Sequence, residues 1–132
     1  MYKHTLILTL LLTTLTASQL SNNAIAQGDF TKAFKTLTQE AKKGDAQAEY
    51  NLALMYYRGD GVKRNIAKSA ELLELSAQKG YKKAIDNVGR IYMQLLKFDK
   101  AKKWLTINAQ NGDENAKKLL KSIEETQLRE PR

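Results

Sequence analysis

The side chains that most often carry catalysis or hold metals are scarce in this chain. It has no Cys and a single His, His4, beside 14 Asp and Glu residues. Catalytic zinc is held mainly by His and Cys, and the common nucleophile–base pairs also need His. Pairs of carboxylates can hydrolyse glycosides, but most acidic residues here lie at expected helix starts or beside basic residues, where capping and solvation explain them. We therefore expect no enzyme activity, no metal and no cofactor.

One short motif invites a functional interpretation. Arg58-Gly59-Asp60 is the tripeptide that many adhesion proteins present to integrins. The phosphate-binding patterns GxxxxGK[ST] and GxGxxG are absent, and Gly59-Asp60-Gly61 is too short to replace them. Gly59 and Gly61 fall where the chain must reverse between two expected helices, and glycine permits the positive φ that such a turn needs. We interpret the triplet as part of a structural turn.

The N-terminal residues have the pattern of a signal peptide. Lys3 and His4 precede the apolar run 6–17, which is too short to span a bilayer. Small residues follow at positions 24 and 26, in the spacing that signal peptidase reads. We expect residues 1–26 to be removed by cleavage between Ala26 and Gln27, with an uncleaved membrane anchor as the alternative. The expected location is the periplasm or the outside of the cell.

The expected mature chain of 106 residues is basic. Cleavage removes only Lys3 among the charged side chains, leaving 21 Lys and Arg against 14 Asp and Glu, a net charge of +7. Lysines in the last turn of a helix also favour the helix dipole, yet this charge would attract acidic surfaces. Aromatic and basic residues are not interleaved, so nucleic acid is not an expected partner. The basic pairs are Lys42-Lys43, Lys63-Arg64, Lys82-Lys83, Lys102-Lys103 and Lys117-Lys118.

Amphipathic helices of one type recur along the chain. Each begins with a large apolar residue, has a small residue three positions later, and ends at a glycine eleven positions beyond that. Glycine most easily adopts the left-handed conformation that ends a helix, and Asp29 and Asn65 are expected N-caps of the first two copies. In the third copy the cap position is Lys97. The three copies are Phe30-x-x-Ala33 to Gly44, Ile66-x-x-Ser69 to Gly80, and Phe98-x-x-Ala101 to Gly112.

Helices of a second type alternate with these. Ala48, Leu52, Ala53 and Tyr56 recur thirty-six residues later as Ala84, Val88, Gly89 and Tyr92. The small residue at 53 or 89 lets a neighbouring helix approach closely, and the tyrosine fills the space one turn on. A third copy starts with Ala116 and Leu120 but has Lys121 and Glu124 at the small and tyrosine positions. A terminal repeat has no following helix to admit, so a polar outer face is expected.

These residues resemble the Sel1-like repeat, a relative of the tetratricopeptide repeat. The second unit, about 81–112, lacks the Gly-x-Gly-Val loop of the first and is closer to a plain tetratricopeptide unit. The first unit, about 45–80, matches the pattern at Ala48, Leu52, Ala53, Tyr56, Gly59, Gly61, Val62, Lys68, Ser69, Leu72, Ala77 and Gly80. The second matches at Ala84, Gly89, Tyr92, Lys100, Ala101, Trp104, Ala109 and Gly112.

The resemblance implies an all-α fold, a short right-handed α-solenoid of antiparallel helix pairs with about six helices. One domain is expected over residues 27–128, with half-repeats at both ends and a loose tail at 129–132. Val62 is expected in the joint between repeats, and Trp104 in the core.

The resemblance also implies a concave groove that holds a protein segment. Aromatic residues are typical binding anchors, and Tyr50, Leu54 and Tyr57 form an apolar stripe; packing of this stripe against a neighbouring helix is an equal alternative. Asp86 and Arg90 are expected to pair across one helical turn. The groove positions carried over are Gln47, Tyr50, Leu54, Tyr57, Lys83, Asp86, Arg90 and Met93.

Two functions are weighed against each other, and a carboxylate enzyme is kept only as a residual third alternative. The favoured one is an exported interaction module that binds a protein segment in its groove, as an adaptor in the bacterial envelope or at a host interface. The alternative is an electrostatic binder of anionic envelope lipids or polymers through the lysine pairs. Salt would weaken the second type of binding steeply and the first type little. The identity of the partner and the oligomeric state do not follow from the sequence.

Overall fold

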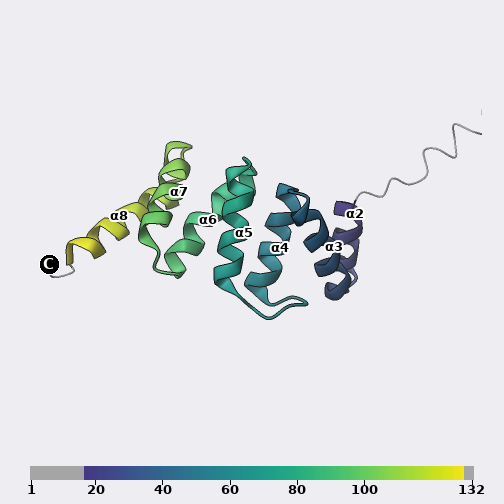
Figure 1. Ribbon diagram of the computed structural model, residues 1–132. Helices are drawn as coiled ribbons and strands as arrows, with labels where there is room; N and C mark the ends of the chain where they lie inside the picture. Colours follow the sequence, from purple (N-terminus) through teal and green to yellow (C-terminus); the bar gives the residue numbers. More distant parts are fainter. Residues whose placement is uncertain (1–16, 130–132) are drawn as a thin grey trace, which may run out of the picture.

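The structure, a computed structural model, describes residues 17–129 (Figure 1). The described part of the chain forms seven helices and no strand, and consecutive helices are joined by short turns except for one longer loop at 59–65. The helices are α2 (Ala17–Ala26), α3 (Phe30–Lys42), α4 (Ala46–Arg58), α5 (Ile66–Gln78), α6 (Lys82–Gln94), α7 (Phe98–Gln110) and α8 (Glu114–Arg129).

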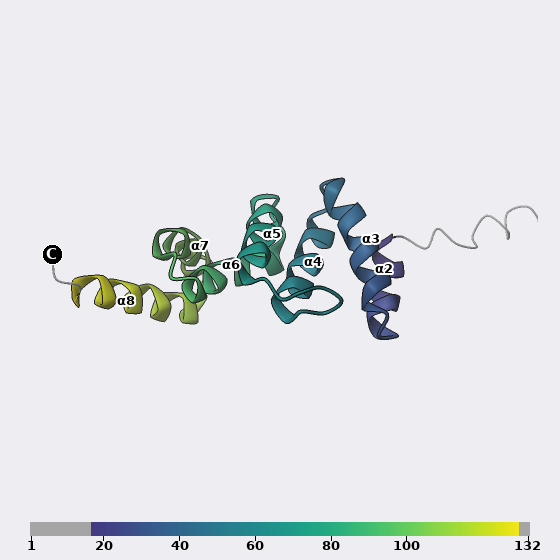
Figure 2. The same cartoon turned by 60° about the horizontal axis from the view of Figure 1, so that its bottom comes forward.

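The helices stack in chain order. Each one packs mainly against the helix before it and the helix after it, and Figures 1 and 2 show them side by side from α2 at one end to α8 at the other. Such a stack buries a continuous core by nearest-neighbour contacts alone. The expected all-α solenoid is confirmed, and α3–α8 are the six helices expected after residue 26. Within residues 17–129 no helix is both long and apolar enough to cross a bilayer.

The helix ends follow from the residues placed at them. Asp29 and Asn65 accept hydrogen bonds from the backbone N–H groups of Lys32 and Lys68, at 3.0 and 2.9 Å, so both are N-caps as predicted. Asp45 caps α4 in the same way. Lys97, at the start of α7, makes no side-chain cap.

Close approach of two helices depends on the small residue predicted for it. A Cβ atom added at Gly89 of α6 would lie 2.9 Å from Cγ of Leu105, on α7, and 3.3 Å from the Leu105 backbone nitrogen. No side chain larger than hydrogen fits there unless α7 shifts. The sequence therefore identified the position that sets the distance between α6 and α7.

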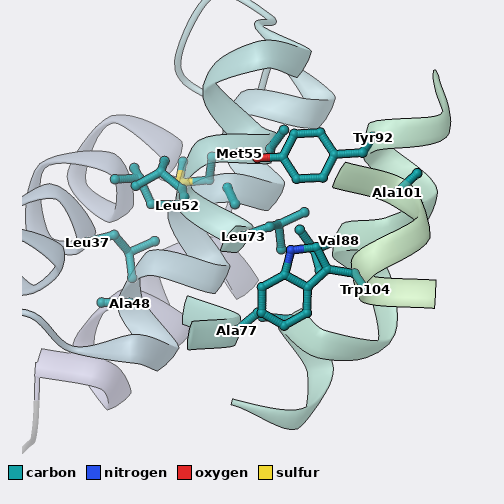
Figure 3. Close-up of a cluster of buried hydrophobic side chains, with 14 of the residues drawn as sticks. Leu37, Ala48, Leu52, Met55, Leu73, Ala77, Val88, Tyr92, Ala101 and Trp104 are labelled. Atoms are coloured by element: carbon teal, nitrogen blue, oxygen red, sulfur yellow. The ribbon is translucent and has the colours of Figure 1, made fainter. Parts of the chain in front are cut away.

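Large side chains fill the spaces between these closely packed helices (Figure 3). Tyr92 and Trp104 are only 2% and 4% exposed, so Trp104 lies in the core as predicted. Tyr56, one repeat earlier than Tyr92, meets Phe34 edge-on at 5.7 Å between ring centroids. The apolar core is thus continuous from α3 to α7.

A polar cluster lies at the edge of this core around Glu74 of α5, which is partly buried. Its carboxylate accepts hydrogen bonds from the Tyr92 hydroxyl at 2.5 Å, from Lys100 Nζ at 2.7 Å and from Trp104 Nε1 at 3.4 Å. Burial raises the pKa of Glu74, but these hydrogen bonds outweigh burial and hold the pKa below its ordinary value. Glu74 therefore stays charged and ties α5 to α6 and α7.

This cluster predicts a loss of stability at alkaline pH. Burial, and then the hydrogen bond to Glu74, raise the pKa of Tyr92 from 10.0 to about 12. Between these values the unfolded chain has released the phenol proton while the folded chain still holds it, so stability falls as pH rises. Hydrogen bonds to Glu74 and Tyr92 also raise the pKa of Lys100, which adds to the same trend.

We expect the free energy of unfolding to fall less steeply in Tyr92→Phe than in the wild type between pH 10 and pH 12, because Phe does not titrate. Urea unfolding at a series of pH values, followed by far-UV circular dichroism, measures both slopes. Parallel slopes would contradict this account of the cluster.

The loop between α4 and α5 packs against the start of α3. A Cβ atom added at Gly61 would lie 2.8 Å from the carbonyl oxygen of Phe30, and Gly61 has a φ of 67°. Val62 is half-buried and packs against the core. Gly59, within the Arg-Gly-Asp triplet, also has a positive φ of 81°. The glycines of this loop are thus explained by the fold.

Helix α2 consists of residues that we assign from the sequence to the signal peptide. Ser21 is fully buried and lies beside Leu37 and Ala48. The turn from α2 to α3 has the same pattern of backbone hydrogen bonds as the turn from α6 to α7, and the turns after α3, α5 and α7 share it, so α2 joins the stack in the same way as the later helices. The matching bonds are Gln27 N to Asn23 O, Gly28 N to Ile25 O and Asp29 N to Ala24 O, against Leu95 N to Ile91 O, Leu96 N to Met93 O and Lys97 N to Tyr92 O.

Cleavage after Ala26 stays a prediction. It would remove α2 and uncover the side of Leu37 that Ser21 now covers. The rest of the proposed signal peptide, residues 1–16, and the C-terminal residues 130–132 lie outside the described residues.

Candidate functional site

A partly open cavity lies between α4 and α6, with α5 at its base. Its volume is about 230 Å³. Ser69 and Leu73 of α5 form the base and are buried, whereas the residues from α4 and α6 are half-buried or exposed. The cavity therefore opens on the face formed by α4 and α6, which we call the α4–α6 face. The lining residues are Leu54, Tyr57, Ser69, Leu73, Asn87, Arg90, Ile91 and Gln94.

Helical spacing brings these residues together. Residues 54 and 57 are three apart on α4, and residues 87, 90, 91 and 94 follow the i, i+3, i+4, i+7 pattern on α6, so each set shares one side of its helix. The small positions that let the helices approach lie on other sides, toward the core. Each helix of the second type can thus pack against the core with one side and present a second row of side chains on another side.

Polar groups surround the mouth of the cavity. Gln94 Nε2 donates to the Tyr57 hydroxyl at 3.2 Å, which links α6 to α4 across the opening. Arg64 lies over the Tyr57 ring at 5.6 Å, and its Nε donates to the Tyr57 carbonyl at 2.9 Å. The Tyr57 ring is therefore held from the loop side and is a fixed aromatic surface at the rim.

The base of the cavity contains an unsatisfied polar atom. The Ser69 hydroxyl is fully buried and has no hydrogen-bond partner. Buried polar atoms are nearly always paired, and each exception needs an explanation. The hydroxyl oxygen is itself closed off from the cavity, so its lack of a partner belongs to the packed core beneath the cavity.

The structure places only three of the eight groove residues expected from the sequence at the cavity. Leu54, Tyr57 and Arg90 line the cavity. Tyr50 packs against Tyr81 with 5.3 Å between ring centroids, and burial raises the pKa of its hydroxyl. Met93 packs against the core. Gln47 and Lys83 are exposed on the same two helices.

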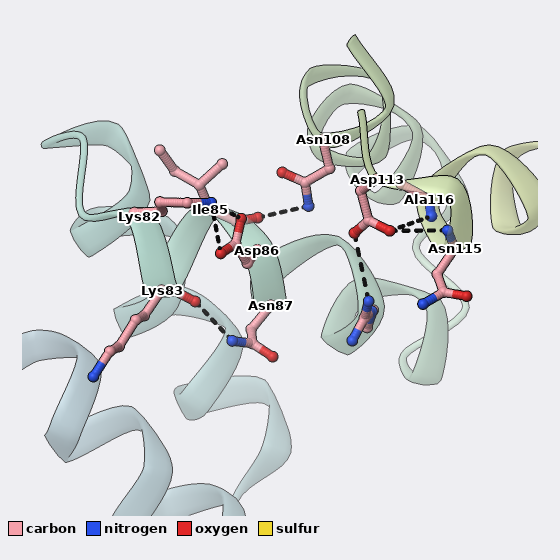
Figure 4. Close-up of polar contacts among 10 residues, drawn as sticks. Lys82, Lys83, Ile85, Asp86, Asn87, Asn108, Asp113, Asn115 and Ala116 are labelled. Carbon is pink, nitrogen blue, oxygen red and sulfur yellow. Dashed lines mark hydrogen bonds and ion pairs between the residues drawn. The ribbon is translucent and has the colours of Figure 1, made fainter. Parts of the chain in front are cut away.

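The expected pairing of Asp86 with Arg90 does not form (Figure 4). Both carboxylate oxygens of Asp86 accept from Lys82 Nζ at 3.0 Å, and Arg90 instead reaches Asp113, before α8, at 3.5 Å. Lysine four residues before Asp competes for the same carboxylate, which leaves Arg90 to bridge two repeats. Asp86 therefore takes no part in the cavity.

Five cavity residues are missing from the sequence-based set. Asn87, Ile91 and Gln94 follow from Arg90 by helical spacing and could have been found by extending the row in both directions. Ser69 and Leu73 belong to α5, a helix of the first type. All groove positions expected from the sequence lie on helices of the second type. One sequence feature distinguishes this helix: Ser69 stands where the other two helices of the first type have Ala33 and Ala101.

A second cavity opens on the opposite face, between α3 and α5 with α4 at its base. Its volume is also about 230 Å³, and Leu52, Tyr56 and Leu75 are among its lining residues. Glu49 at its base is buried and pairs with Lys79, while its Oε2 atom has no partner. Lys42 and Lys68 stand at its edges, so this cavity combines charges of both signs.

Neither cavity has the composition of a metal centre. Within the described residues no group of three or more His, Cys, Asp or Glu side chains could hold a metal ion. The α4–α6 face offers instead apolar walls, an aromatic rim, neutral polar groups and one cationic residue, Arg90, which suit recognition of another chain.

Comparison with known proteins agrees with the fold. Residues 46–81, from α4 through α5, match the family model described as Sel1 repeat. The sel1-like repeat-containing protein L18 of Acanthamoeba polyphaga mimivirus is 48% identical over 42 residues, covering 32% of this chain and 7% of that protein. Protein L21 of the same virus, also described as sel1-like repeat-containing, is 32% identical over 81 residues, covering 61% of this chain and 15% of the relative. The chain thus spans only a small part of these relatives. Sel1 repeats generally mediate protein–protein interaction.

Proposed function

We propose that this helical repeat protein, whose residues 46–81 are a Sel1 repeat, is an exported adaptor that binds a segment of another protein along its α4–α6 face. The observation that carries the proposal is the cavity of about 230 Å³ on that face, with Leu54 and Ile91 on its walls and Tyr57 at its rim. Pockets that take a side chain of a partner are typically apolar with a few placed polar groups.

The geometry of α4 and α6 supports an elongated ligand. The exposed row runs from Gln47 and Lys83 past the cavity to Gln94, along helices of 13 residues each. At 1.5 Å per residue each helix is about 20 Å long, which matches about six residues of extended chain. One anchor side chain in the cavity would then fix the register of the segment.

The lysine pairs support the electrostatic alternative less well. Several of these lysines already pair with acidic residues one turn away on their own helices, which compensates part of their charge locally. Exposed pairs of this kind contribute little energy and are screened by salt. These ion pairs are Lys43 with Glu40, Lys82 with Asp86, and Lys117 with Glu114.

Photo-crosslinking in the cell of origin tests the proposal. A crosslinking residue replaces Tyr57 at the rim of the cavity or, as the control, Lys102 on α7. We expect one discrete protein adduct from position 57, unchanged in added salt, and none from position 102. A smear of adducts from both positions that salt removes would overturn the proposal and favour binding of anionic polymers through the lysines.

A further inference from the structure

The turn between α6 and α7 has a residue type that its geometry disfavours. Five turns of the described stack share one pattern, in which a residue with positive φ donates its N–H to a carbonyl three positions back and the next residue donates to a carbonyl five positions back. The left-handed residue in this pattern is normally glycine, because a side chain strains the backbone there. Four of the five turns have glycine, at 28, 44, 80 and 112, and the fifth has Leu96, with a φ of 55°.

Burial does not compensate for this strain. Leu96 is 72% exposed, whereas its neighbour Leu95 packs against the core. Glycine would serve the fold at least as well, as it does in the matching turn between α2 and α3, where Gly28 stands at the position of Leu96. A strained residue that the fold does not need points to a role outside the fold.

Leu96 lines an open hollow between the α6–α7 turn and the end of α8. The hollow has a volume of about 490 Å³, and its lining mixes apolar and charged groups, so no closed apolar wall selects one side chain of a peptide. Leu128, which follows Gln127 on α8, is 85% exposed. The turn and the helix end that flank the hollow thus each have an exposed leucine. The lining residues are Leu96, Lys97, Phe98, Asp99, Lys100 and Gln127.

Both leucines belong to one edge of the stack. Because consecutive helices alternate in direction, the loop 59–65, the α6–α7 turn and the C-terminal end of α8 lie on the same side, which is the lower side in Figure 1. We call this side the loop edge. A peptide follows one groove, whereas a planar surface contacts the loops of successive repeats at the same time. The loop edge is therefore suited to a flat partner.

Cations without a carboxylate partner lie along the loop edge. Four of its exposed Lys and Arg residues form no ion pair within residues 17–129, and two carboxylates, Asp60 and Asp99, lie among them. The lysines described above as compensated on their own helices lie near the opposite edge. An anionic surface is therefore attracted to the loop edge in particular. The four cations are Arg58, Lys63, Arg64 and Lys97.

We propose that the loop edge docks on a membrane surface that contains anionic lipids, with Leu96 inserted below the head groups and the four cations beside them. Exposed apolar side chains next to basic residues are the combination that holds peripheral proteins at such surfaces. The loop edge lies at the helix ends, whereas the α4–α6 face lies along the helix sides. Docking therefore leaves that face accessible and adds a second surface that does not depend on the proposed function.

Sedimentation with lipid vesicles tests the proposal on the full chain. The vesicles contain phosphatidylcholine alone, or phosphatidylcholine and phosphatidylglycerol in equal parts. We expect Leu96→Gly to weaken binding to the anionic vesicles about tenfold or more, the factor that corresponds to burial of a leucine side chain. Lys97→Gln should weaken it about fivefold. The urea midpoint of Leu96→Gly should be equal to that of the wild type or higher, because glycine relieves the strain.

Leu75→Ala and Lys118→Gln are the matched controls. Leu75 is 46% exposed and lines the cavity between α3 and α5, and Lys118 is exposed in the first turns of α8, near the opposite edge. Both variants should bind the anionic vesicles nearly as the wild type does. Because all variants share one full-length chain, any contribution of the apolar run 6–17 to vesicle binding is the same in each of them.

Several results would overturn the assignment to a lipid surface. The wild type could fail to bind anionic vesicles, bind both kinds of vesicle equally, or bind no better than Leu96→Gly. A dimer detected by light scattering that Leu96→Gly dissociates, without vesicle binding, would make the loop edge a contact between two copies. The adduct expected at position 57 should persist in Leu96→Gly, so this proposal and the proposed function can fail separately.

Discussion

Replacing Trp104 with Ala should destabilise the protein by about 3–5 kcal/mol, the range measured for removing a buried tryptophan or phenylalanine from a core. Trp104 is 4% exposed, and its ring belongs to the cluster formed with Leu73, Val88 and Tyr92 (Figure 3). Its loss leaves a cavity between α5, α6 and α7 and removes one donor to Glu74. Urea unfolding followed by circular dichroism at 222 nm measures the change, since the variant has no tryptophan fluorescence.

Trp104→Phe is the control for this prediction. It keeps most of the ring volume and removes the indole N–H, whose contact with Glu74 is the longest in that cluster at 3.4 Å. We expect this variant to lose less than half of the stability lost in Trp104→Ala. Equal losses in both variants would show that the hydrogen bond, and not packing, is what Trp104 contributes.

Gly61→Ala should cost at least about 2 kcal/mol, the sum of two separate effects. A non-glycine residue in the left-handed region costs about 1–2 kcal/mol, and forcing extra atoms into a packed site costs about 1–3 kcal/mol. The added Cβ would meet the Phe30 carbonyl group at 2.8–2.9 Å, so the loop has to move away from α3. Urea unfolding again gives the change in the free energy of unfolding.

Gly80→Ala separates these two effects. Gly80 has a similar positive φ of 85°, but nothing lies within 4 Å of a Cβ atom added there. It should show the conformational cost alone, about 1–2 kcal/mol. If Gly61→Ala were no more destabilising than Gly80→Ala, the contact between the loop and Phe30 would not stabilise the fold.

The repeat architecture could be predicted because each repeated residue has a local physical role. Asp29 and Asn65 cap their helices, and Gly89 allows the close approach of α7. Lys121 and Glu124 are exposed on the last helix, as expected for a terminal repeat. Such roles depend on a residue and its nearest turn or neighbouring helix. They are therefore visible as periodic residue types in a single sequence.

The cavity could be predicted only in part, because it depends on three helices at once. The row on α4 gave Leu54 and Tyr57, but the base comes from α5, where a buried serine looks like a conservative replacement for alanine. Arg90 was placed correctly on the α4–α6 face, whereas its expected pairing with Asp86 was wrong, because Arg90 reaches Asp113 instead. The choice of partner depends on Lys82 and on the distance between repeats, which spacing along one helix does not contain.

The N-terminal boundary shows a different limit of sequence reasoning. Residues 17–26 combine the small-residue spacing of a cleavage site with the packing of a repeat helix, in which Ser21 and Ala24 are buried. Both features use small residues, at 24 and 26 for the peptidase and at 21 and 24 for the close contact with α3. One stretch of sequence thus satisfies two patterns, and the processing of the chain decides between them.

Binding of a protein segment to the α4–α6 face is tested best by the effect of Leu54→Glu on the adduct formed at position 57. A glutamate in the cavity wall places an unpaired charge where the anchor side chain would lie. Leu75→Glu is the matched control, because Leu75 is 46% exposed and lines the cavity on the opposite face. We expect Leu54→Glu to abolish the discrete adduct and Leu75→Glu to retain it, with both variants folded by circular dichroism. An adduct that survives Leu54→Glu, or one that Leu75→Glu removes equally, would contradict it.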